Sequence, residues 1–276
     1  MKLFSWRGRG GAARTTRTPL DQATALYQAG RYAAAEAEAR SVAAARSRSR
    51  DDAYAPLALG IAALAAGAQG RHADAVTTYD ALLPVFGRIF GAEHPQTLKV
   101  RSDRAQALSS LARHAECEAE CAAVARVAAR GTGPDMALIT TAARNGQIFA
   151  LTALGRHSEA EALAYEALAA HRASDRFTLV LRLGLARSLN GQGRHEEALA
   201  EAKRADELFR GLPPEQCRSE TGAVELATAT ALLGLERGTE ARPPAVAAHD
   251  ACLAALGPDH RRTVEAKALL DRIDSA

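Results

Sequence analysis

The chain has 276 residues and a formal net charge of +3, and 47% of its residues are apolar although only 4% are aromatic. It contains no run of 18 apolar residues, and its first residues lack the apolar segment of a signal peptide, so we expect a cytoplasmic protein without a transmembrane helix. Residues 1–17 carry five basic and no acidic side chains, so the remaining residues sum to −2. This near-neutral body does not favour specific nucleic-acid binding.

Residues 1–17 are basic and rich in glycine, and we predict that they form a disordered tail. Phe4 and Trp6, the only tryptophan, lie next to Lys2 and Arg7. Aromatic and cationic side chains together suit the surface of an anionic membrane. Weak contact of the tail with such a surface is therefore the alternative to a tail without a partner.

From residue 18 onward the chain is predicted to be helical. Thr18-Pro19-Leu20-Asp21 is typical of a helix start, and apolar residues then recur at spacings of three and four. The predicted helices alternate between the first and the second member of a pair. The first helices are expected at 18–29, 52–69, 95–111, 135–154, 176–192 and 214–234. The second helices are expected at 32–46, 72–88, 114–130, 157–172, 195–210 and 242–256, and a last helix at 260–274 would cap the array.

A short signal separates the two helices of each pair. It reads Gly-Arg followed by Tyr or His in four copies, starts with Ala112 in another, and is degraded near Glu236 in the sixth. A small residue follows five positions later in every copy, and the copies recur about every 41 residues. These small residues are Ala35, Ala75, Cys117, Ala160, Ala198 and Ala241. A period of this length indicates a solenoid in which each helix pair buries its apolar face against its neighbours.

The turn string Gly-Arg-His-x-Glu-Ala, present at 155–160 and 193–198, resembles the inter-helix turn of tetratricopeptide repeats. A small residue also stands seven positions before most of the turn glycines, as this family requires, whereas Ile148 departs from that pattern. The longer period comes from linker strings at 91–98 and 257–264 that are similar to those of the kinesin-light-chain type. The resemblance implies an all-α solenoid of about six tetratricopeptide-like helix pairs plus a C-terminal capping helix, spanning residues 18–276. Armadillo and HEAT repeats share the period but lack this turn signal.

The sixth pair is irregular because Pro243 and Pro244 would remove backbone donors from the interior of a helix. We therefore expect its second helix to begin at about Arg242, after a longer turn.

The residues that could carry chemistry have structural explanations. His72, His114, His157 and His195 occupy one repeat position, so they are spaced along the array and are expected to pack against neighbouring helices. His114, Cys117 and Cys121 share a helical face, which would suit part of a metal site, but the thiols also fit as small buried residues. No catalytic constellation or phosphate loop is found. We therefore expect no enzyme activity, no cofactor and no metal.

The resemblance implies that the first helices line a concave groove that receives a protein or peptide partner. Polar side chains projected to that face, with one phenyl ring among them, concentrate in the middle of the chain. These groove candidates are Lys99, Ser102, Gln106, Ser109, Asn145, Phe149, Thr152, Arg187 and Asn190. Amide and guanidinium groups can hold peptide backbone and carboxylates, so a peptide-binding scaffold is the favoured function. A structural or self-associating module, and a regulatory protein that senses a peptide signal, are the alternatives, and the oligomeric state is left open.

Overall fold

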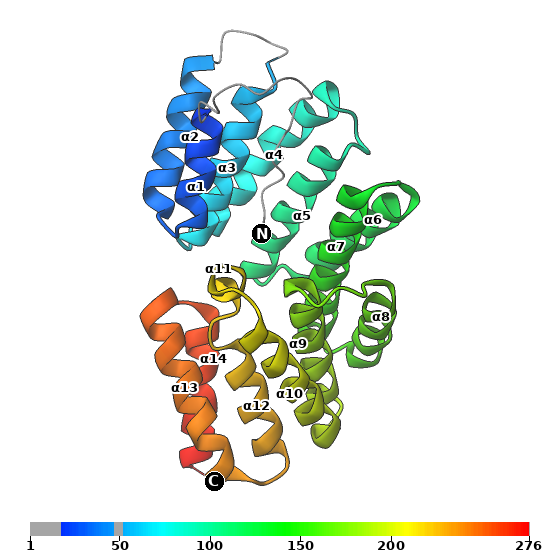
Figure 1. The fold of residues 1–276 in the computed structure, drawn as a ribbon, viewed down its shortest axis with the longest axis vertical. Helices are drawn as coiled ribbons and strands as arrows, with labels where there is room; N and C mark the ends of the chain where they lie inside the picture. The colour runs from blue at the N-terminus through cyan, green and yellow to red at the C-terminus, as the bar shows by residue number, and fades with distance from the viewer. Residues whose placement is uncertain (1–17, 47–51, 276) are drawn as a thin grey trace. The chain divides into compact units, whose positions relative to one another are not determined.

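The structure is a computed structural model that describes residues 18–46 and 52–275. Within these ranges the chain forms fourteen α-helices and one short 3-10 helix, with no strand (Figure 1). The predicted disordered tail, residues 1–17, lies outside the described residues. No helix in the described part of the chain is long and apolar enough to cross a lipid bilayer.

The chain divides into two compact units, Met1–Leu111 and Ala112–Ala276. The described helices of the first unit are α1 (Pro19–Gln28), α2 (Tyr32–Arg46), α3 (Tyr54–Ala68), α4 (His72–Ile89) and α5 (Pro95–Ser110). Each of them packs on the next, and α1 also contacts α3, and α3 contacts α5. The first unit therefore has the helix-pair stacking that the repeat predicts.

The second unit continues the alternation. Its elements are α6 (His114–Arg130), α7 (Pro134–Ala153), α8 (His157–Ala170), α9 (Arg176–Gly191), α10 (His195–Gly211), α11 (Pro214–Cys217), η1 (Arg218–Glu220), α12 (Ala223–Gly234), α13 (Gly238–Leu256) and α14 (Arg261–Asp274). The first helices also contact one another in the order α7, α9, α12 and α14, so they form one layer of the unit. This layer carries the candidate site described below.

The turn signal is a helix C-cap followed by a helix start. At the end of α9, Gly193 takes a left-handed conformation with φ 74°, and the Arg194 amide donates to the Leu189 carbonyl at 3.0 Å. This is the hydrogen-bond pattern of a Schellman motif, which requires a positive φ that glycine adopts without strain. Ala112 and Glu236 take the same conformation, with φ 58° and 61°. The signal near Glu236 is therefore a sixth copy in its geometry as well as in its position.

The arginine of the signal ties neighbouring helix pairs together. Arg194 forms a bidentate pair with Glu197 on its own helix and reaches Glu161 of the preceding second helix at 2.6 Å. Gln192 donates to the same Glu161 carboxylate at 2.8 Å. These hydrogen bonds raise the pKa of Arg194 above its ordinary value. In the first unit, Arg71 contacts Glu36 in the same way, so the arginine has a structural role.

The small residue and the histidine of the signal are packing positions. The six small residues after the turns are at most 1% exposed, so each lies in the core of its helix pair. The rings of His157 and His195 lie directly against Gly191 and Gly234 of neighbouring first helices, where a Cβ atom would overlap them. The expectation that the repeated histidines pack against neighbouring helices is confirmed at these two positions.

The paired cysteines are buried in the interface between α6 and α7. Cys117 and Cys121 are 1% and 2% exposed, and their Sγ atoms lie 4.0 Å apart. A Cβ atom at Gly146 on α7 would overlap the Cys121 Sγ, so the two helices approach closely at this point. Hydrogen bonding to Cys117 and burial both raise the pKa of the Cys121 thiol. The pair fills space as protonated thiols, and the described residues hold no cluster of three or more side chains suited to a metal ion.

The helix limits agree with the prediction to within two residues, except in the sixth pair. The expected first helix at 214–234 is wrong, because the chain breaks at Gly222, which has φ 70° and packs against Cys252 and the Ala248 backbone. The predicted start of the second helix at Arg242 is also wrong, because α13 begins at Gly238.

Pro243 and Pro244 are accommodated in the second turn of α13. The carbonyls that their missing N–H groups would have met belong to Thr239 and Glu240, by the i to i−4 pattern of a helix. Both of these residues are exposed, so water can satisfy their carbonyls.

Candidate functional site

The nine groove candidates are distributed over both units. Lys99, Ser102, Gln106 and Ser109 lie on α5 in the first unit. Asn145, Phe149 and Thr152 lie on α7, and Arg187 and Asn190 lie on α9, in the second unit. The structure brings together Phe149, Thr152, Arg187 and Asn190. Asn145 is half-buried on α7, one turn before Phe149.

On α5 the polar side chains are largely occupied within the first unit. Lys99 contacts the carboxylate of Asp103 one turn later, and both side chains are mostly buried. Burial raises the pKa of Asp103, and the nearby Lys99 opposes this shift. Ser102 is buried, and its Oγ has no hydrogen-bond partner among the described residues. Gln106 is exposed and Ser109 is half-buried.

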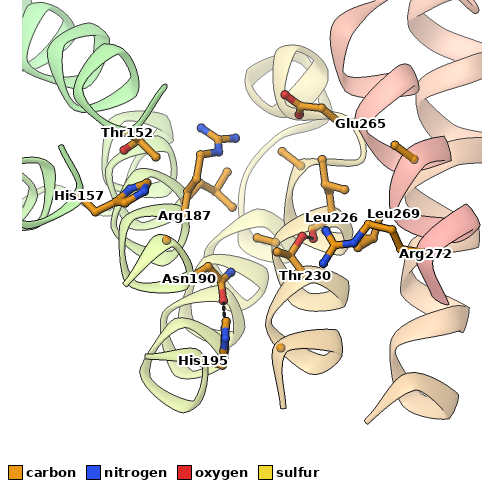
Figure 2. A pocket seen from close by; sticks show the side chains of 16 residues that line it. Thr152, His157, Arg187, Asn190, His195, Leu226, Thr230, Glu265, Leu269 and Arg272 are labelled. Atoms are coloured by element: carbon orange, nitrogen blue, oxygen red, sulfur yellow. Dashed lines mark hydrogen bonds between the residues drawn. The ribbon is translucent and has the colours of Figure 1, made fainter. Parts of the chain in front are cut away.

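The second unit contains a cavity of about 580 Å³ between its first helices (Figure 2). Side chains from α7, α9, α12 and α14 line it, and His157 of α8 and His195 of α10 contribute their rings. Its lining residues are Thr152, His157, Leu183, Arg187, Asn190, Gly191, His195, Ala223, Leu226, Ala227, Thr230, Gly234, Glu265, Ala268, Leu269 and Arg272. A cavity of this size, mainly apolar with a few convergent polar groups, has the character of a ligand site.

Arg187 of α9 is one of the two arginines that line the cavity. Its side chain is half-buried and forms no ion pair within residues 18–46 and 52–275. Its guanidinium carbon lies 5.2 Å from the centroid of the Phe149 ring, within cation–π range. Burial lowers the pKa of Arg187 to about 10, against the attraction of Glu265. The residue stays charged at neutral pH, although its surroundings in this unit do not supply a paired anion.

A second guanidinium covers the same phenyl ring. Arg261, the first residue of α14, lies 4.4 Å from the Phe149 centroid. It also pairs with Glu265 one turn later at 2.7 Å. Because Phe149 belongs to α7, this contact joins α14 to α7 beside the cavity. The Arg261–Glu265 pair therefore neutralises the one carboxylate that lines the cavity.

Neutral hydrogen-bonding groups complete the lining. The Asn190 side-chain oxygen lies 3.0 Å from the His195 Nδ1 (Figure 2). Its amide nitrogen has no partner among the described residues and can donate to a ligand. Thr152 and Thr230 donate to carbonyls of their own helices at 2.8 Å and 2.7 Å, which leaves their oxygen lone pairs as acceptors.

Sequence reasoning missed Glu265, Ala268 and Arg272 of α14 because this helix was expected only to cap the array. The linker strings contain the signal that would have found them. Thr97 and Thr263 donate to the carbonyls of Gly91 and Gly257, both at 2.8 Å.

The histidines of the two linkers also act alike. His94 and His260 are helix N-caps whose Nδ1 atoms accept from backbone amides two residues later, both at 3.2 Å. Helix α14 thus begins as α5 does and is a first helix. Alignment of the two strings places Glu265 at the position of Lys99 and Arg272 at that of Gln106, on the groove face.

Comparison with known proteins identifies the fold. No protein-family model matches the chain, and no curated protein sequence matches it. Solved structures do match the chain, and those described here are helical-repeat proteins. A tetratricopeptide repeat protein from Parabacteroides merdae superposes with a TM-score of 0.62 at 16% identity, covering 93% of this chain and 83% of that one.

Two further neighbours refine this class. The kinesin light chain repeats of Podosopora anserina match with a TM-score of 0.57 at 20% identity, covering 69% of this chain and 92% of theirs. PlcR of Bacillus thuringiensis, solved with the peptide PapR7 and DNA, matches with a TM-score of 0.57 at 16% identity, covering 80% of this chain and 74% of that one. The chain therefore has the tetratricopeptide-repeat solenoid fold, and the resemblance seen in the sequence is confirmed.

Proposed function

We propose that the chain is a non-catalytic binding protein whose second unit holds a peptide segment of a partner protein. The observation that carries this proposal is the cavity of about 580 Å³ on the first-helix layer, with a half-buried arginine that has no paired anion among the described residues. Preformed helices present its side chains, so binding would order the ligand more than the protein. The site lies farther along the chain than the middle region favoured by the sequence, because α12 and α14 contribute to it.

Two observations support a peptide as the ligand. The lining mixes apolar side chains from α9, α12 and α14 with separate donors and acceptors, as recognition of a peptide requires. PlcR, which shares the fold, was solved with a bound peptide, and this likeness is an analogy of fold. The four cysteines, all within the described residues, form no disulfide, which suits the cytoplasmic location that we propose.

Filling the cavity tests the proposal. Ala268 lines the cavity from α14 but is otherwise exposed, so Ala268→Trp would place an indole in the cavity at little cost to folding. Peptides would first be selected from a random display library on the full chain, and their affinities measured by fluorescence anisotropy. We expect Ala268→Trp to weaken binding by about tenfold or more, equivalent to about 1.4 kcal/mol.

The matched control is Ala254→Trp, an exposed position of α13 outside the cavity. It should bind the selected peptides as the wild type does. Equal affinity of the two tryptophan variants, or failure of the library to yield any peptide, would refute the cavity as a peptide site. Sedimentation of the same proteins over a concentration series would show whether self-association accounts for the scaffold instead.

A further inference from the structure

We propose that the cavity selects acidic segments, in which two side-chain carboxylates flank an apolar residue and pair with Arg187 and Arg272. This inference rests on the proposed function and names the chemistry of its ligand. Figure 2 shows Arg187 on α9 and Arg272 on α14 to either side of Leu226 and Thr230 of α12.

The guanidinium of Arg187 has hydrogen-bond donors available for a ligand. The Arg187 guanidinium lies over the Phe149 ring, and a cation–π contact of this kind leaves its N–H groups available as hydrogen-bond donors. Because the described chain supplies no carboxylate within ion-pair distance, these donors lack a charged acceptor. A carboxylate from a ligand would complete the site with charge-assisted, bidentate hydrogen bonds.

The lining of the cavity carries more positive than negative charge. The charged lining residues are Arg187, Glu265 and Arg272. Arg261, next to the cavity, pairs with Glu265 at 2.7 Å and so offsets the one negative charge among these lining residues. Arg272 is exposed and has no ion pair among the described residues. The cavity therefore presents two uncompensated cations, which favour a ligand with two negative charges.

Leucine side chains form an apolar surface between the two arginines. Leu226 of α12 and Leu269 of α14 are 9% and 4% exposed, and both line the cavity together with Leu183 of α9. Helix α12 lies between α9 and α14, so the two arginines belong to helices about two packing distances, or about 16–20 Å, apart. An extended peptide rises about 3.3 Å per residue, and the long side chains of the arginines and of the ligand's acidic residues shorten the span, so carboxylates two to four residues apart would meet them. The apolar residue between the carboxylates would lie on the leucines.

Matched peptides test this inference. Peptides selected on the wild type would be made with acetylated and amidated ends, so that only side chains carry charge, and each glutamate or aspartate would be replaced by its amide. We expect the selected sequences to contain two acidic residues and each amide replacement to weaken binding. Arg187→Gln should lower affinity about 10- to 100-fold, as for loss of a charge-assisted hydrogen bond. Arg272→Gln, at an exposed position, should lower it about two- to fivefold.

Controls separate this inference from folding effects and from the proposed function. Arg172→Gln removes an exposed arginine outside the cavity and should leave affinity unchanged. If Arg187→Gln fails to fold, Arg272→Gln and the salt dependence of wild-type binding still test the pairing. Glutarate competing as strongly as the peptide would overturn the peptide source in favour of a small dicarboxylate. Peptides that lack acids, or that bind Arg187→Gln and Arg272→Gln unchanged, yet are lost in Ala268→Trp, would overturn the acidic ligand and leave the proposed function intact.

Discussion

Gly184 of α9 is the position where packing and helix propensity make opposite predictions. Ile148 of α7 occupies a site that is small in most other copies of the repeat, and it is fully buried. A Cβ atom built on Gly184 would lie 2.9 Å from the Ile148 Cγ2, closer than carbon atoms can approach. Glycine at 184 thus compensates for the large residue at 148, and Gly184→Ala should force the two helices apart.

The expected change in the free energy of unfolding is the difference between two opposing effects. Alanine in place of glycine within a helix gains about 1 kcal/mol from backbone propensity. Overpacking of a filled core costs about 1–3 kcal/mol, and the branched, buried Ile148 side chain has no space into which to move. We therefore expect Gly184→Ala to lower the free energy of unfolding of the second unit by about 1 kcal/mol. At Gly60 of α3, no side chain or neighbouring helix of the described part of the chain lies within 4 Å of the added carbon. The same change there should raise the free energy of unfolding of the first unit by up to about 1 kcal/mol.

Hydrogen exchange with mass spectrometry measures both effects, because peptides from α9 and α3 report on each unit separately. Adding Ile148→Ala supplies a second test. That change alone should cost about 2–5 kcal/mol, but Gly184→Ala should then become neutral or stabilising, since the clashing carbon is gone. If Gly184→Ala stabilises α9 as Gly60→Ala stabilises α3, the close approach of α7 and α9 is not as the structure has it.

Two further predictions concern the turns and the ion pairs between helix pairs. Glu236 holds a left-handed conformation with φ 61°, which is strained for a residue with a side chain, so Glu236→Gly should raise the free energy of unfolding by about 1 kcal/mol. Calorimetry should show this change as a higher Tm, and a lower Tm would contradict strain at this position. For Glu36, burial opposes ionisation, but hydrogen bonds from Arg71, Arg40 and Gln69 outweigh it and lower the pKa below the ordinary 4.5. The stability that Glu36 contributes is thus present above about pH 4.5 and lost as the pH falls through the lower folded-state pKa. Urea unfolding between pH 3 and 6 should be less pH-dependent in Glu36→Gln than in wild type, and an unchanged slope would refute this assignment.

Most of the fold could be predicted because its signals are local. A positive φ, a proline at a helix start and a small residue five positions after a turn each act within one or two turns of chain. For this reason the Gly-Arg-His copies placed most helix limits to within two residues. The break at Gly222 was not predictable in this way, because it depends on the approach of Cys252 from another helix.

The candidate site could be predicted only in part from local sequence signals. Residue types and helix faces identified Phe149, Thr152, Arg187 and Asn190, which do come together in the second unit. They could not indicate that α14 completes the cavity, or that Glu265 pairs with Arg261 while Arg187 forms no ion pair with any described residue.

The sequence by itself therefore determined the helices, their pairing and the repeat, since these follow from backbone conformation and the burial of small residues. Only the tertiary structure decided which side chains meet across the first-helix layer. Contacts such as that between Phe149 and Arg261 join residues more than one hundred positions apart, and they depend on how successive helix pairs stack.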